Sequence, residues 1–139
     1  MPPKVFVDTS AWIAYSLKGE PKHEIIRKLI KESIEKGSIL TTSGDVVDET
    51  ITRLVYDTNL TIAQKFFEFI SQATRDSRLV QLWTDEETQK EAAGVLEKFC
   101  DHKLSFTDAT SVVFIKRFGI QKIITLDSDF AKIGLRSLP

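Results

Sequence analysis

The stretch K-V-F-V-D-T-S at residues 4–10 has the form of a buried strand that ends in an acid and passes into a helix. Its apolar run presents no polar face, which is typical of strands covered on both sides in parallel sheets. Asp8 would then lie at the carboxyl end of the strand, the edge where open α/β sheets bind ligands. The stretch K-I-I-T-L-D-S at residues 122–128 repeats this form and ends in Asp127. The two acids therefore predict a shared site.

The composition is that of an ordinary globular protein with one domain, residues 1–139. The chain has 19 basic and 20 acidic residues, for a net charge of −1. A nucleic-acid partner would therefore have to be held by a local basic patch. The single cysteine, Cys100, excludes an intrachain disulfide and favours a reducing compartment. The sequence has neither a signal-peptide pattern nor the roughly 18 apolar residues of a transmembrane helix. We therefore expect a cytoplasmic protein that does not contact membranes.

Apolar runs that favour strands alternate with segments of helical periodicity. Strands are predicted at 5–7, 39–41, 79–83 and 122–126, with a last extended piece at 135–138. Helices are predicted at 11–17, 21–36, 61–78 and 104–118. Two further helices are predicted, one after the cap at 42–43 and one that begins with a capping box formed by Thr84 and Glu87. The helix at 104–118 is apolar almost all round and should be buried. This order predicts an α/β fold, a parallel sheet sandwiched by helices.

Polar and aromatic side chains near these boundaries give further expectations. Thr9 and Ser10 are expected to cap the first helix, and Thr61 the helix that it opens. The tryptophans, Trp12 and Trp83, and Tyr15 are expected in the core or an interface, in preference to platforms for stacked bases.

Each acid also has a structural explanation. Asp8 and Asp127 could cap the helices that follow them, although neighbouring hydroxyls offer other caps. Asp108 completes a capping box in S-F-T-D, yet a carboxylate on a buried helix is costly unless it is paired, hydrogen-bonded or bound to a cation. Cap and ligand both remain open for Asp108. Helical geometry alone does not distinguish Glu49 from Asp45 and Asp48.

Carboxylates without cysteine pairs or clustered histidines favour a hard cation, Mg²⁺ or Mn²⁺. The chemistry that suits such a site is hydrolysis of phosphodiesters. No glycine-rich nucleotide-binding motif is present. A phosphatase with Asp8 as nucleophile is a further alternative, although Ser10 occupies the place of the second acid of a D-x-D-x-T arrangement.

Four segments in order resemble the PIN-domain nucleases, and among them the small VapC-type toxins of toxin–antitoxin pairs. They are V-F-V-D-T-S-A-W-I near the start, T-T-S-G-D-V-V-D-E-T at 41–50, L-S-F-T-D-A-T-S at 104–111 and I-I-T-L-D-S-D-F at 123–130. The resemblance implies a three-layer α/β/α sandwich with a central parallel sheet of about five strands. It also implies four catalytic acids that bind Mg²⁺ or Mn²⁺: Asp8, Glu49, Asp108 and Asp127.

The same resemblance assigns supporting residues and partners. Asp101 and Asp129 are implied as acids near the ligands or at a second ion, and the hydroxyls that hold the carboxylates are those of Thr9, Ser10 and Thr125. Leu126 departs from the polar residue that many relatives have. The implied function is an endoribonuclease acting on single-stranded or loop RNA. A cognate antitoxin and a homodimer, with Phe67 as a possible interface residue, are also expected. The alternative is an inert binding or regulatory module on the same fold.

Overall fold

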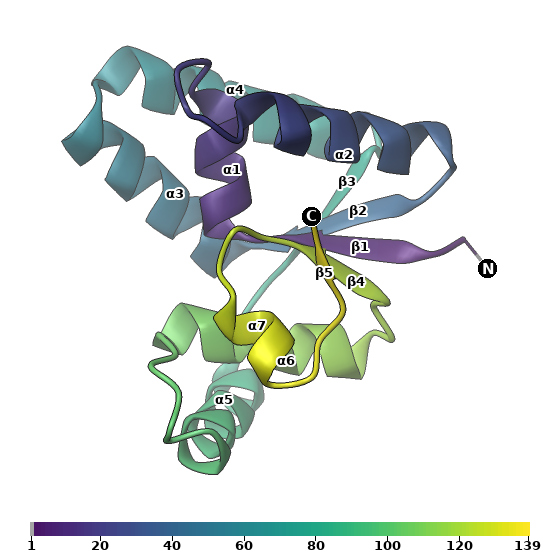
Figure 1. The fold of residues 1–139 in the computed structure, drawn as a ribbon, viewed down its shortest axis with the longest axis vertical. Coiled ribbons are helices and arrows are strands. Elements are labelled where there is room, and N and C mark those ends of the chain that lie inside the picture. The colour runs from purple at the N-terminus through teal and green to yellow at the C-terminus, as the bar shows by residue number, and fades with distance from the viewer. Residues whose placement is uncertain (1) are drawn as a thin grey trace.

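The protein, seen in a computed structural model that describes residues 2–139, is built on a sheet of five parallel strands in the order β3-β2-β1-β4-β5 (Figure 1). The elements in chain order are β1 (Lys4–Val7), α1 (Thr9–Ser16), α2 (His23–Glu35), β2 (Ile39–Ser43), α3 (Gly44–Asp57), α4 (Leu60–Arg75), β3 (Leu79–Leu82), α5 (Glu86–Lys98), α6 (Phe106–Arg117), β4 (Lys122–Ile124), α7 (Asp129–Lys132) and β5 (Ser137–Leu138). The predicted α/β class and parallel sheet are confirmed.

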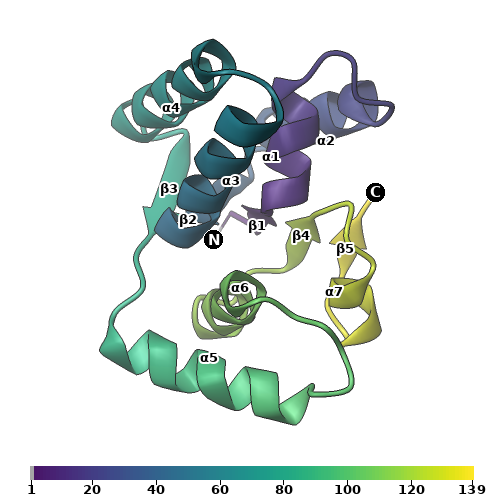
Figure 2. The ribbon, with the colours of Figure 1, turned by 90° about the vertical axis from the view of Figure 1, so that its left-hand side faces the viewer.

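Helices cover both faces of the sheet, so the fold is the expected three-layer sandwich. Figures 1 and 2 show α1 to α4 on one side and α6 and α7 on the other, with α5 packed outside α6. Ala109 and Val113 of α6 are buried in a small cluster with Ala92 of α5. Helix α6 is therefore enclosed between the sheet and α5, which explains why its sequence is apolar on almost every side.

Apolar spacing decides which side of each outer helix faces the core. Helix α4 buries Ala63, Phe66, Ile70 and Ala73, which recur every three or four residues. Phe67 falls outside this stripe and is 55% exposed. None of the helices within residues 2–139 has the length and apolar character needed to cross a membrane.

The caps of α4 and α5 differ from the sequence prediction by two residues and by one residue. Helix α4 is capped by Asn59, whose side chain accepts a hydrogen bond from the Ile62 amide at 3.0 Å, and not by Thr61. Helix α5 is capped by Asp85, which accepts from the Thr88 amide at 2.8 Å. The predicted capping box of Thr84 is therefore wrong.

The two tryptophans occupy opposite environments. Trp12 is fully buried in the core and packs against Phe66 and Phe69 of α4, as expected. Trp83 is 71% exposed, which excludes the core for this residue, so of the two expected environments only an interface stays a prediction. It follows β3, the edge strand of the sheet, beyond which no further strand of the described chain covers it.

Candidate active site

The order of the strands reverses between β1 and β4, and this position determines where a site can form. The chain passes from β1 outward to β2 and β3, then returns to place β4 on the other side of β1. Val7 pairs with Ile124, and the Asp8 amide donates to the Ile124 carbonyl at 3.0 Å. Asp8 and Asp127 thus follow neighbouring strands at the point where open α/β sheets bind ligands.

Asp8 is almost completely buried, with 4% of its surface exposed. Its Oδ2 accepts hydrogen bonds from the Thr125 hydroxyl at 2.9 Å and the Ser10 hydroxyl at 3.2 Å. Its Oδ1 is buried without any hydrogen-bond partner. Burial, and then the charge of Asp108, raise the pKa of Asp8 to about 6, although both hydroxyls oppose the shift. An ionised carboxylate with an unpartnered buried oxygen is a strong candidate for binding a cation.

The hydroxyls that hold Asp8 also hold the segment after β4. Thr125 Oγ1 accepts from the Asp127 amide at 3.0 Å, and Ser10 Oγ accepts from the Leu126 amide at 2.9 Å. Ser10 and Thr125 therefore fix the two strand ends relative to each other, in the role that the resemblance implies. The Thr9 hydroxyl is buried without a partner, so its expected contact with a carboxylate is not found. Neither Thr9 nor Ser10 caps α1, because Asp8 occupies the N-cap position and makes no side-chain cap bond.

Asp108 forms the predicted capping box at the start of α6. The Asp108 amide donates to Ser105 Oγ and the Ser105 amide donates to Asp108 Oδ2, both at 3.0 Å. Burial is the main cause that raises the pKa of Asp108, and the charges of Asp127 and Glu49 add to it. Since Asp108 also acts on Asp8, this helix N-terminus lies within electrostatic reach of the other three acids.

Glu49 differs from the two neighbouring acids of α3 in its surroundings. Asp48 is exposed, and Asp45 accepts a hydrogen bond from the Thr84 hydroxyl. Glu49 is half-buried, and its charge acts on Asp108. The structure therefore distinguishes Glu49 from Asp45 and Asp48, which sequence periodicity did not.

The remaining acids of the sequence analysis have different surroundings. Asp127 Oδ1 accepts from the Asp129 amide at 2.9 Å, so Asp127 also stabilises the turn into α7. Asp129 lies 3.9 Å from the Lys132 ammonium, whereas Asp101 is exposed in the turn after α5.

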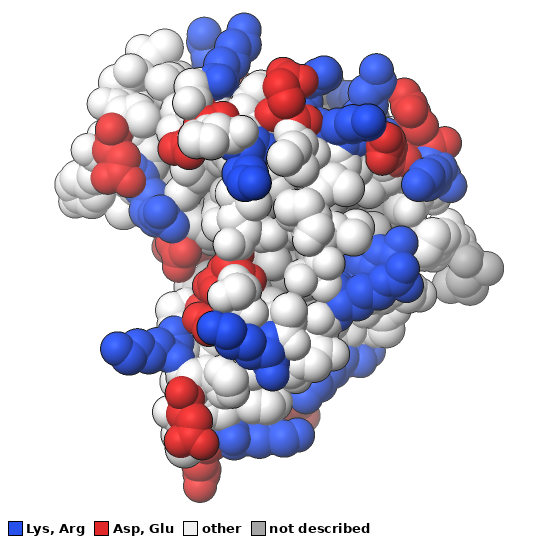
Figure 3. All heavy atoms as spheres, viewed as in Figure 1, with Lys and Arg blue, Asp and Glu red and all other residues white. Residues whose placement is uncertain are grey.

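The four central acids share a lack of positive partners. None of the ion pairs within residues 2–139 involves Asp8, Glu49, Asp108 or Asp127. Acidic side chains can be seen in the hollow between the two helical layers, at the left of Figure 3. Such a set of oxygen donors fits Mg²⁺ or Mn²⁺ in its chemistry. No three His, Cys, Asp or Glu side chains of the described chain are, however, already placed to hold an ion.

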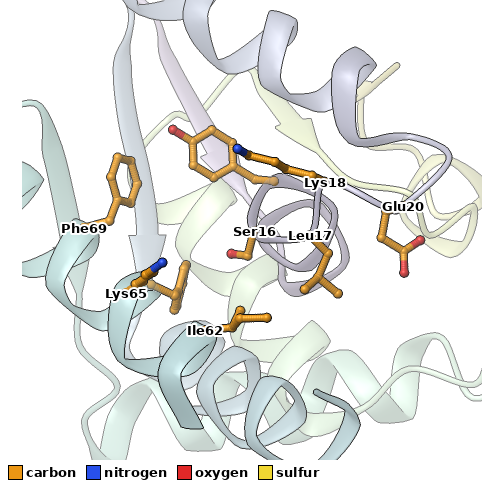
Figure 4. Close-up of a pocket in the computed structure, with 10 residues that line it drawn as sticks. Ser16, Leu17, Lys18, Glu20, Ile62, Lys65 and Phe69 are labelled. Atoms are coloured by element: carbon orange, nitrogen blue, oxygen red, sulfur yellow. The ribbon is translucent and has the colours of Figure 1, made fainter. Parts of the chain in front are cut away.

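A separate groove lies away from the four acids. It has a volume of about 650 Å³ between the end of α1, the loop that follows and α4 (Figure 4). Its lining combines apolar side chains such as Leu17, Ile62 and Phe69 with the charges of Lys18 and Lys65. None of the four acids lines this groove, which is at the opposite end of α1 from Asp8.

Comparison with known proteins extends over nearly the whole chain. The PIN domain family matches residues 5–135. The 23S rRNA-specific endonuclease VapC20 of Mycobacterium tuberculosis is 29% identical over 131 residues, covering 94% of each protein. Ribonuclease VapC26 of the same organism is 29% identical over 127 residues, covering 88% of this chain and 86% of VapC26.

Solved structures agree with this comparison. The crystal structure of M. tuberculosis VapC20, described as a Sarcin-Ricin loop cleaving toxin, superposes with a TM-score of 0.82 at 26% identity and covers 94% of this chain and 95% of VapC20. VapBC2 from Rickettsia felis, bound to a DNA fragment from its promoter, matches with a TM-score of 0.67 at 13% identity, covering 97% of each chain. The second likeness concerns the fold alone.

Proposed function

Because this chain belongs to the PIN domain family, we propose that it is a metal-dependent endoribonuclease of the VapC toxin type. The observation that carries the proposal is the buried Asp8 carboxylate, whose Oδ1 has no hydrogen-bond partner. Asp8 lies where the strand order of the sheet reverses, and the charge of Asp108 helps to raise its pKa. The similarity to VapC20 and VapC26, both named as RNA-cleaving enzymes, supports the same reaction.

Asp8, Asp108 and Asp127 are the proposed metal ligands, with Glu49 completing the set. Each aspartate keeps one oxygen in a hydrogen bond with the protein, and no hydrogen bond within residues 2–139 uses the other. Four carboxylates near one another repel each other, and a bound divalent cation would offset that repulsion.

The protein's own contribution to the reaction is positioning and charge. A bound Mg²⁺ or Mn²⁺ would polarise the phosphate and lower the pKa of the attacking water. Ser10 and Thr125 hold the Asp8 carboxylate in one orientation, while the capping box fixes Asp108. Glu49 lies on α3, and its charge raises the pKa of Asp108, so its carboxylate is proposed to orient a water or bind a second ion. Single-stranded or loop RNA is the proposed substrate, since its phosphates can enter the acidic hollow.

We also expect a small antitoxin protein that covers the acids, in a cytoplasmic setting consistent with a single cysteine, Cys100, that forms no disulfide within the chain. A homodimer is proposed through the outer face of α3 and α4. Leu60 and Phe67 are 59% and 55% exposed there and line a groove of about 530 Å³ with Ile51. The mass of the particle in solution tests the dimer, and a monomer at micromolar concentration would contradict it.

The nuclease is tested by incubating the protein with a sarcin–ricin stem–loop RNA and with total RNA, with and without Mn²⁺. Asp8→Asn should reduce cleavage by more than about 100-fold, because replacing even the partners of metal ligands costs about 10- to 100-fold. The matched control is Asp48→Asn, which removes an exposed acid of α3 and should cleave like the wild type. Metal-dependent cleavage that survives in Asp8→Asn would rule this site out.

The competing function is an inert PIN-fold binding module. One observation favours it, the lack of three side chains within residues 2–139 already placed to hold an ion. Calorimetric titration with Mn²⁺ separates the two functions: the inert module predicts no binding at millimolar metal, whereas the nuclease predicts binding that Asp8→Asn weakens.

A further inference from the structure

Three large apolar side chains are exposed next to the segments that carry the acids. Trp83 follows β3, Phe106 is two residues before Asp108, and Leu126 precedes Asp127, with exposed fractions of 71%, 43% and 39%. Single exposed apolar residues are common on protein surfaces. Phe106 and Leu126 adjoin Asp108 and Asp127 in the sequence, while Trp83 follows a strand of the same sheet and is the largest and most exposed of the three.

The position of Trp83 depends on a glycine. A Cβ atom on Gly44, the first residue of α3, would lie 2.6 Å from Cζ3 and 2.7 Å from Cε3 of the Trp83 ring. The six-membered ring of the indole therefore rests directly on the backbone where α3 begins. The residue after Trp83, Thr84, donates a hydrogen bond to Asp45, which follows Gly44 in the first turn of α3. Trp83 is thus held on one side by α3 while the rest of the ring faces solvent.

Trp83 lies at the carboxyl ends of the strands, as the candidate ligands do. Leu82 pairs with Ser43, so Trp83 and Gly44 extend neighbouring strands at the same level, and β2 is in turn adjacent to β1. Two strand spacings separate β3 from β1, about 10 Å. This span suits a base that flanks a phosphate bound at Asp8. The helix that supports Trp83 also carries Glu49.

The negative charge of this edge makes an uncharged contact with a base the effective way to hold RNA there. The edge carries four carboxylates without an ion-pair partner in the described chain, and the protein as a whole has a net charge of −1. RNA phosphates would be repelled by these acids until a cation is bound. Stacking on an aromatic ring is uncharged, tolerates any base, and provides affinity that this edge cannot gain from salt bridges.

We propose that Trp83 is a base-stacking residue that binds a nucleotide flanking the scissile phosphate, and that Gly44 lacks a side chain so that the indole can occupy this place. This proposal rests on the nuclease function proposed above for its substrate class. Trp83 acts on binding and positioning of the RNA, and it does not touch the reacting phosphate.

Fluorescence tests the contact directly, because the only other tryptophan, Trp12, is fully buried. In an Asp8→Asn background, a stem–loop RNA should quench the exposed fluorescence and protect it from acrylamide. Adding Trp83→Ala should remove both effects and weaken RNA binding by roughly 5- to 150-fold, the measured range for loss of one stacked base. Trp83→Phe, which keeps a smaller ring, should recover part of the affinity.

Two further variants separate stacking from general damage. Gly44→Ala should displace the indole and weaken RNA binding in the same direction as Trp83→Ala, with Mn²⁺ affinity unchanged. Tyr56→Ala removes an aromatic ring that is 83% exposed near the other end of α3, about 18 Å away, and should bind RNA normally. If Asp8→Asn binds RNA with the same affinity with and without Trp83→Ala, the proposal is overturned. The exposed ring would then be a contact for a protein partner.

Kinetics distinguish this inference from the nuclease assignment. In the active protein, Trp83→Ala should raise KM for RNA while kcat changes little, because the contact is lost equally from bound substrate and transition state. Cleavage by the wild type with a KM that Trp83→Ala does not change refutes the inference alone. RNA binding through Trp83 without any cleavage refutes the nuclease and leaves the stacking contact standing.

Discussion

In the absence of divalent cations and near pH 7, the Asp8→Asn variant should unfold at a higher temperature than the wild-type protein. Asp8 is buried beside Asp108, and its Oδ1 has no hydrogen-bond partner. Keeping this carboxylate ionised therefore costs folding free energy. Asparagine keeps one oxygen as an acceptor for Ser10 and Thr125 but carries no charge.

The size and the pH window follow from the pKa of Asp8, which burial and then the charge of Asp108 raise from 3.8 to about 6. Below about pH 3 Asp8 is mostly protonated in both folded and unfolded chains and has almost no effect on stability. As the pH rises to about 6, the unfolded chain loses its proton before the folded one, so the wild type loses stability. Above that range the loss levels off at about 3 kcal/mol, the equivalent of two pKa units. The amide left without a partner in the variant lowers this gain.

The assay is thermal unfolding of both proteins in a chelator across pH 4 to 8. A difference of about 3 kcal/mol corresponds to roughly 10 °C in Tm for a domain of this size. The two proteins should unfold at similar temperatures near pH 4 and separate as the pH rises. Mg²⁺ should then raise the Tm of the wild type and leave the variant almost unchanged.

Asp48→Asn is the control for the loss of one negative charge, since Asp48 is exposed on α3. It should follow the wild type at every pH and respond to Mg²⁺. A stability gap between Asp8→Asn and the wild type that is the same at pH 4 and pH 7 would refute the account of Asp8. Equal stabilisation of both proteins by Mg²⁺ would show that the ion binds elsewhere.

Two further substitutions probe the groups that hold the acids. Thr125→Val removes the hydroxyl that donates to Asp8 and accepts from the Asp127 amide, and should lower the free energy of unfolding by about 1–3 kcal/mol and weaken Mn²⁺ binding, as measured by denaturant titration and calorimetry. Unchanged Mn²⁺ affinity would show that Thr125 does not support the metal site. Ser105→Ala removes half of the capping box, and should cost about 1 kcal/mol and reduce RNA cleavage through the loosened Asp108; loss of stability with full activity would leave Asp108 as a cap only.

Most of the fold could be predicted because its signals are local. Apolar runs that end in an acid or hydroxyl marked the strands, and the fully apolar helix at 104–118 indicated a buried layer. The caps of α4 and α5 were misplaced because Asn59 and Asp85 compete with Thr61 and Thr84 within one or two residues. Only tertiary contacts decide such competition, as when Thr84 bonds to Asp45 across the sheet edge.

The candidate site was predictable to a different degree at each residue. Asp8 and Asp127 followed from parallel topology, since the carboxyl ends of adjacent parallel strands lie at one edge. Glu49 required the family resemblance, because its half-buried environment depends on how α3 faces α6 and has no signature in periodicity. For Trp83 the sequence left the core and an interface open, because the exposure of a residue after an edge strand depends on what lies beyond that strand, which the residue itself does not encode.

Asp108 shows why a cap and a metal ligand are not alternatives for one carboxylate. The Ser105 amide uses Oδ2, which orients the group and leaves Oδ1 outside the cap. The same division holds for Asp8, where two hydroxyls share Oδ2, and for Asp127, where the Asp129 amide takes Oδ1. Each short motif thus supplies its acid with a donor two or three residues away, which fixes the carboxylate before any ion is bound. Preorganised oxygens of this kind lower the cost of gathering four negative charges at one edge, and this is why an acid that satisfies a capping pattern should not be removed from a list of candidate ligands.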